Sequence, residues 1–126
     1  MTIAQQLKIK DFPFIIKDKD GNELYGENSD AYWGKTEYDA HGREIYYENS
    51  DGWWYKNEYD AHGNQIRYGD STGFWRKREY NAQDEEIYYE NSDGIIIDNR
   101  PKIVELTLQQ IADKLGIDVT QLRIKD

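Results

Sequence analysis

Cysteine is absent from the chain, which excludes disulfides, thiolate nucleophiles and cysteine-based zinc sites. No apolar run reaches about 18 residues, so we expect no membrane-spanning helix. The N-terminal stretch lacks a basic segment followed by an apolar one, which argues against a secretory signal and favours a cytoplasmic protein. No P-loop, nucleophile elbow or G-x-G-x-x-G motif occurs either, and we predict that the chain is not an enzyme.

Basic residues are few: 16 Lys and Arg stand against 25 Asp and Glu, for a formal net charge of −9. This balance opposes direct binding to nucleic acid or to anionic membranes. Aromatic residues are plentiful, with 11 Tyr, 4 Trp and 3 Phe in 126 residues. Acidic disordered chains are poor in aromatics, so we expect one folded domain.

An internal repeat is the main signal in the sequence. Four units of 21 residues follow one another without a gap, at 17–37, 38–58, 59–79 and 80–100. Two sets of residues recur at fixed positions: Trp33, Trp54 and Trp75, and Leu24, Ile45, Ile66 and Ile87. Segment 1–16 is expected to cap the array at its N-terminal end, and segment 101–126 at its C-terminal end, because terminal repeats have an unpaired edge.

Each unit alternates two turn signals with two short aromatic runs. In the second unit Asn49–Gly52 is one turn, and Asp60–Asn64 begins the third unit with the other. Aromatic runs between turns are typical of strands. The sequence therefore predicts a mainly β fold, an antiparallel meander of about eight or nine strands. Since no other segment supplies a second sheet, the sheet is either single-layered or coiled upon itself.

The odd period must be absorbed somewhere, because strand side chains alternate with period two. A hairpin loop that ends in a left-handed Gly can absorb it through a bulge, and Gly21, Gly42 and Gly63 occupy that position. Asp84 replaces this Gly in the fourth unit, which predicts a looser or differently shaped turn. Pairing of Tyr47 with Trp54 across the Asn49–Gly52 turn would place these two residues on one face. The other face would then carry Tyr46, Glu48, Trp53, Tyr55, Asn57 and Tyr59.

The C-terminal segment has a different pattern. Residues 102–106 favour a strand, and 107–110 match a capping box. An apolar stripe at Leu108, Ile111, Ala112 and Leu115 predicts a helix, with Gly116 at its end, that packs on the sheet as a cap. The same helix is also typical of the first half of a helix-turn-helix. A DNA reader needs a second, recognition helix, for which too little chain remains, so we favour the cap.

The units resemble the YD repeats of Rhs-type proteins, through the turn sequences at 38–43 and 59–64. The stretches 46–49 and 88–91 are similar to MORN-type repeats found in some proposed bacterial antitoxins. The C-terminal tail looks like that of small phage and mobile-element proteins. These resemblances imply a β-hairpin repeat, and they suggest an inhibitor of a host defence protein or a toxin-neutralising protein.

Metal and catalytic sites are weak predictions. His41 and His62 occupy equivalent turns, which lie two strands apart, about 9–10 Å, too far for one zinc ion. The stretch 18–22 resembles the opening of a calcium loop but lacks the further ligands. Paired carboxylates have no expected cleft between them. We therefore expect no metal and no cofactor.

The third unit is net basic within an acidic array, and its cations lie beside aromatic residues. This pattern predicts a contact patch for a protein partner, since Tyr, Trp and Arg dominate interface hot spots. The acidic, aromatic-rich surface around the patch favours a partner with a basic surface. The candidate residues are Trp53, Tyr55, Tyr59, Phe74, Arg76 and Arg78. Two alternatives remain: the aromatics stack on carbohydrate, or the chain is a structural repeat that self-associates at its edges. Arg76 and Arg78 also have a plainer interpretation, as cross-strand partners of acidic neighbours.

Overall fold

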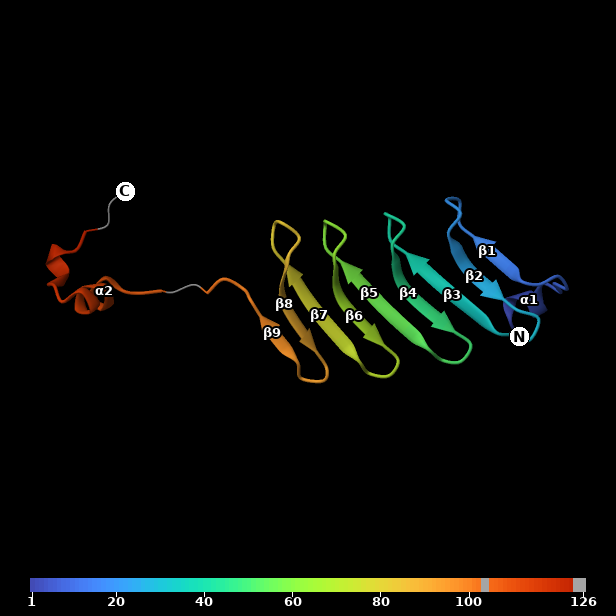
Figure 1. Cartoon of the computed structure of the whole chain (residues 1–126). Helices are drawn as coiled ribbons and strands as arrows, with labels where there is room; N and C mark the ends of the chain where they lie inside the picture. The colour runs from blue at the N-terminus through green and yellow to red at the C-terminus, as the bar shows by residue number, and fades with distance from the viewer. Residues whose placement is uncertain (103–104, 124–126) are drawn as a thin grey trace.

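The computed structural model describes residues 1–102 and 105–123 as one open antiparallel sheet with short helices at either end (Figure 1). The nine strands are hydrogen-bonded in chain order, which confirms the predicted meander. They are β1 (Phe14–Lys17), β2 (Glu23–Glu27), β3 (Trp33–Tyr38), β4 (Glu44–Asn49), β5 (Trp54–Tyr59), β6 (Gln65–Asp70), β7 (Trp75–Tyr80), β8 (Glu86–Asn91) and β9 (Ile96–Asp98). The helical elements are α1 (Ile3–Gln6), α2 (Leu108–Leu115) and the 3-10 turn η1 (Val119–Gln121).

The turns between strands share one design, a three-residue loop that starts after Asp or Asn. The turn before β6 shows it: Asp60 N–H donates to the Asn64 carbonyl at 2.9 Å, and Gly63 N–H donates to the Asp60 carbonyl at 3.1 Å. The Asp60 carboxylate accepts the backbone N–H groups of His62 and Asn64, both at 2.9 Å. The last loop residue has a positive φ, which is 89° at Gly63. Asp, Asn and Gly therefore recur because the loop needs a side-chain acceptor at its start and left-handed backbone at its end.

The expected distortion at Asp84 was wrong. Asp84 takes the left-handed conformation with φ of 62°, and its turn keeps the hydrogen bonds of the others, from Asp84 N–H to Asn81 and from Asn81 N–H to Glu85. Its carboxylate accepts from His62 Nδ1 and Asn64 Nδ2 of the neighbouring turn, each at 2.8 Å. Asp is one of the residues that enter this region at modest cost, and these two contacts help to hold it there.

A bulge in each unit absorbs the odd residue. Between β3 and β4 the pairing shifts from Tyr38 opposite Glu44 to Glu37 opposite Tyr46, which leaves Ile45 as the extra residue. The same shift recurs between β5 and β6 and between β7 and β8. Because one residue is skipped in each unit, equivalent residues of successive units stay on the same face of the sheet.

The predicted assignment of residues to faces was off by one in the turn at 49–53. Tyr47 lies opposite Tyr55, and Glu48 lies opposite Trp54. Asn49 N–H donates to the Trp53 carbonyl at 3.0 Å, so the loop holds one residue more than the predicted pairing assumed. We call the surface that carries Tyr47 and Tyr55 face A, and the surface that carries Glu48 and Trp54 face B. Tyr46 and Glu48 belong to face B, whereas Tyr47 belongs to face A.

The sheet is a single layer with almost no core. In the described chain the only buried apolar residues are Ala4, Tyr25, Tyr88 and Ala112. Stability must therefore come from cross-strand contacts between side chains on both faces, each worth about 0.2–1 kcal/mol.

Helix α1, which the sequence did not predict, fixes the N-terminal end to face B. The carboxylate of Glu27, only 2% exposed, accepts from Thr2 Oγ1 at 2.6 Å, the Tyr25 hydroxyl at 2.7 Å and Ala4 N–H at 3.2 Å. Burial alone would raise the pKa of Glu27, but these three hydrogen bonds outweigh it and the pKa is lowered. Burial, together with the bond to this carboxylate, raises the pKa of Tyr25 to about 12. Buried hydrogen bonds to Glu27 thus attach the N-terminal cap to the sheet.

Helix α2 forms where the sequence predicted it, with the capping box at Thr107 and left-handed Gly116 at its end. Figure 1 shows it beyond β9, next to η1 and clear of both faces of the sheet. The expected packing on the sheet is thus not seen in the described chain, and Leu108 and Leu115 stay exposed. The strand expected at 102–106 includes residues 103 and 104, which lie outside the described residues. Within the described ranges no helix is long and apolar enough to cross a membrane.

Candidate protein-binding face

The six predicted site residues come together on face A. Tyr55 and Tyr59 extend from β5, and Arg76 and Arg78 from β7, in strand positions that alternate onto this face. Trp53 and Phe74 precede these strands at equivalent places, and Phe74 contacts Tyr68 of face A with ring centroids 6.3 Å apart. Four of the six lie on β5 and β7 and two directly precede these strands, so with β6 between them they define a patch across three neighbouring strands.

A continuous row of aromatic rings runs through this patch. Tyr47 and Tyr55 stack with centroids 5.3 Å apart, and Tyr55 lies 6.1 Å from Tyr68, which in turn contacts Phe74. Offset rings at these separations attract one another beyond simple burial. Tyr47 and Tyr68 were missing from the predicted site. The signal that could have placed Tyr47 was the three-residue length of the turn, which sets the register.

Arginine side chains extend the aromatic row toward β8. The guanidinium of Arg76 lies 4.7 Å from the ring centre of Tyr68, and that of Arg78 lies 5.3 Å from Tyr89. Arg76 Nη2 donates to Gln65 Oε1 at 2.9 Å, while Arg78 Nε lies 3.2 Å from a Glu86 carboxylate oxygen. The expected pairing with acidic neighbours thus holds for Arg78, whereas Arg76 bonds to an amide. Stacked, partly buried guanidinium groups are a feature of interface hot spots.

The tyrosines of face A are fixed by hydrogen bonds as well as by stacking. The Tyr55 hydroxyl donates to a carboxylate oxygen of Glu44, and burial, with this bond, raises the pKa of Tyr55. The Tyr59 hydroxyl donates to the Glu44 carbonyl at 2.8 Å, and the Arg43 guanidinium lies 5.0 Å from its ring centre. Contact residues that are already ordered lose little rotamer freedom when a partner binds.

Face B is organised differently, as a ladder of opposite charges. Ion pairs join Lys35 to Glu48 at 3.3 Å and Arg67 to Glu58 at 3.4 Å. Arg100 pairs with Glu79 at 3.1 Å and lies 4.1 Å from the ring centre of Tyr88. Charges that are satisfied within the protein leave less to attract a partner, so we place the candidate interface on face A.

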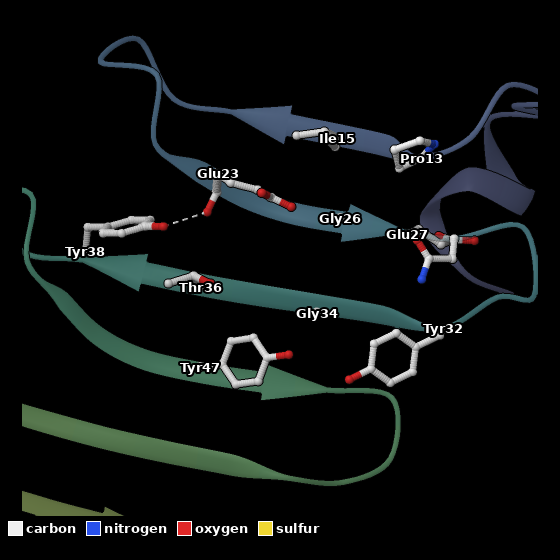
Figure 2. Close-up of a pocket in the computed structure, with 11 residues that line it drawn as sticks. Pro13, Ile15, Glu23, Gly26, Glu27, Tyr32, Gly34, Thr36, Tyr38 and Tyr47 are labelled. Atoms are coloured by element: carbon white, nitrogen blue, oxygen red, sulfur yellow. Dashed lines mark hydrogen bonds between the residues drawn. The ribbon is translucent and has the colours of Figure 1, made fainter.

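A hollow of about 310 Å³ interrupts face A at its N-terminal end (Figure 2). Gly26 and Gly34 lie opposite each other in β2 and β3, where the next unit has Tyr47 and Tyr55. Neighbouring side chains lean over the two glycines, the Glu23 carboxylate over Gly26 and the Tyr47 hydroxyl over Gly34. The hydroxyls of Tyr32 and Tyr47 point toward each other at one end of the hollow. A hydrogen bond to Tyr47 raises the pKa of Tyr32. The sequence contained this signal, since glycine replaces an aromatic residue at both positions of the first unit.

The residues considered for metal binding or catalysis do not form a cluster. In the part of the chain that the structure describes, no group of three or more His, Asp or Glu side chains could hold a metal ion. His62 Nδ1 instead bonds to Asp84, which raises the pKa of His62. Glu44 and Glu48 lie on opposite faces of the sheet, since Glu44 bonds to Tyr55 and Glu48 pairs with Lys35.

Comparison with known proteins does not assign the chain to a family. No protein-family model matches it, and no curated protein is similar to it in sequence. The likeness to YD and MORN repeats therefore stays a resemblance between short motifs.

Proposed function

We propose that this chain is a non-enzymatic repeat protein that binds another protein through face A. The observation that carries the proposal is the continuous row from Tyr47 to Phe74, extended by the stacked guanidinium of Arg76. Such ordered aromatic and arginine side chains are the residues that contribute most to binding energy in interfaces.

The charge distribution favours a partner with a basic surface. The turns at the two long margins of the sheet carry unpaired acidic residues such as Asp20, Asp30, Asp51 and Asp93, each of them exposed. These carboxylates border face A and would steer a basic partner toward it. A partner whose basic surface is a nucleic-acid-binding groove would be blocked by this contact. In that form the chain acts in the cytoplasm as an inhibitor of a host defence protein or of a toxin, in keeping with its resemblance to phage and mobile-element proteins.

Affinity capture with a salt series tests the proposal. Tagged protein is used as bait in a bacterial lysate, and the bound proteins are eluted at rising salt and identified by mass spectrometry. We expect one stoichiometric partner that leaves as salt rises, because exposed charge pairs are screened over about 8–10 Å at physiological salt. Recovery of the folded bait alone would contradict the proposal.

A carbohydrate-binding module is the second candidate, favoured by the exposed indole of Trp53 near Tyr55. Trp53 is 37% exposed, and an indole in this position can stack on a sugar ring. Tryptophan fluorescence measured against a panel of soluble glycans tests this candidate. A saturable change that disappears in Trp53→Ala would favour it over the protein-binding function.

A further inference from the structure

The repeat provides an internal reference for the hollow around Gly26 and Gly34. At the position of Gly34 the second unit has Tyr55 and the third has Arg76. Both of these side chains donate to the residue equivalent to Glu23: Tyr55 to the carboxylate of Glu44, and Arg76 to Gln65. The second and third units thus share one local arrangement, in which a planar donor group forms a hydrogen bond to a side-chain oxygen.

The first unit has the acceptor but lacks the donor. The Glu23 carboxylate folds over Gly26 so closely that a Cβ built on Gly26 would lie 2.4 Å from its Oε1 atom. In the fourth unit the equivalent carboxylate, Glu86, is met by Arg78 from the preceding strand, but here that position is Ile15. Among the described residues, Glu23 makes no side-chain hydrogen bond or ion pair, and its side chain borders the hollow (Figure 2).

We propose that this hollow receives an arginine side chain of the partner protein, which takes the place that Arg76 fills in the third unit. The guanidinium donates to the Glu23 carboxylate and lies beside the ring of Tyr47, as Tyr55 lies beside Tyr68 one unit further on. This inference rests on the proposed function, since it names one anchor of the protein partner on face A.

The lining selects arginine over the other candidates. Among the described lining residues, Glu23 alone presents a charged side chain on face A, because the Glu27 carboxylate is bonded to α1 on face B, and the lining contains no Lys, Arg or His. A neutral ring such as a phenol would leave the Glu23 charge uncompensated. A lysine ammonium would pair with it but has no planar group to lie beside the ring of Tyr47, whereas a guanidinium meets both requirements.

A peptide titration tests the site on the full chain without knowledge of the partner. The probe is acetyl-Gly-Arg-Gly-amide, added to ¹⁵N-labelled protein while the amide signals of Gly26 and Gly34 are followed by NMR. The matched probe contains citrulline, which has nearly the same shape and no charge. We expect saturable shifts at both glycines, with the citrulline peptide binding at least about tenfold more weakly, as for loss of one charge-assisted hydrogen bond.

Three variants separate the hollow from the rest of face A. Gly34→Tyr introduces the residue that Tyr55 provides in the next unit, with the Tyr47 hydroxyl moving aside, and should abolish the shift at Gly26. Glu23→Gln, a small surface change, should weaken binding by about tenfold. Glu44→Gln alters the equivalent residue of the next unit, whose neighbouring space is already filled by Tyr55, and should leave peptide binding unchanged.

Several results would overturn the inference. They are equal binding of the arginine and citrulline peptides, unchanged binding in Glu23→Gln, and shifts produced by maltose but not by the arginine peptide. A lysate partner captured equally well by the wild-type chain and by folded Gly34→Tyr would also overturn it, while leaving protein binding by face A intact.

Discussion

Tyr55 lies at the middle of the aromatic row, and its removal is the sharpest test of what holds a single-layered sheet together. Tyr55→Ala deletes two ring contacts, at 5.3 Å to Tyr47 and 6.1 Å to Tyr68, and the hydrogen bond to Glu44. The ring contacts are worth about 0.5–1.5 kcal/mol each, and the partly exposed hydrogen bond about 1 kcal/mol. We expect Tyr55→Ala to lower the free energy of unfolding by about 3 kcal/mol, and Tyr55→Phe by about 1 kcal/mol.

The assay is urea unfolding followed by far-UV circular dichroism, with Tyr80→Ala as the matched control. Tyr80 extends from β7 on face A, but no described aromatic ring stacks on it. Its loss should therefore cost less than about 1 kcal/mol. If Tyr55→Ala and Tyr80→Ala cost the same, the stacked row is not a principal source of stability and the reasoning from ring contacts fails.

Three further predictions concern the turns and the open edge. Ala31 has φ of 70° where the equivalent turns have Gly, so Ala31→Gly should raise the free energy of unfolding by about 0.5–1 kcal/mol, measured in the same urea assay. Backbone N–H donors lower the pKa of the Asp18 and Asp60 carboxyl groups. These two carboxylates therefore stabilise the fold above their unfolded pKa of about 4, and this contribution is lost as pH falls through the folded pKa. Asp18→Asn with Asp60→Asn should therefore flatten acid unfolding, as Asn81 makes the same turn bonds with no charge; an unchanged acid midpoint would count against this. Ile96 on edge strand β9 is 60% exposed, so any self-association in analytical ultracentrifugation should weaken in Ile96→Lys, and an unaltered concentration dependence would place the contact elsewhere.

The meander was predictable because the same turn and strand signals recur in each of the four units. Asp or Asn at the start of each turn and a left-handed residue at its end divide the chain into strands without reference to tertiary structure. Backbone propensity alone does not predict the regular turn at Asp84, because His62 and Asn64 of the adjacent turn bond to its carboxylate. That contact crosses between units and does not appear in any single one.

The two faces were harder to predict, since one residue in a loop length exchanges them. The Asn49–Trp53 backbone bond decides that Tyr47 joins Tyr55 on face A, and no side-chain pattern distinguishes the alternatives when both faces carry aromatics. The hollow was readable in principle from Gly26 and Gly34 against the other units. The ligand chemistry that the hollow can recognise depends on the position of the Glu23 carboxylate, which only the three-dimensional structure shows.

The most direct test of protein binding by face A compares three baits in the same lysate capture. Trp53 on face A and Trp75 on face B are the same residue type and are similarly exposed, at 37% and 42%. The baits are the wild-type chain, Trp53→Ala and Trp75→Ala, each first shown to be folded. We predict that the wild-type chain and Trp75→Ala retain the partner, while Trp53→Ala loses most of it. Loss of the partner with Trp75→Ala but not with Trp53→Ala would contradict the account and move the interface to face B.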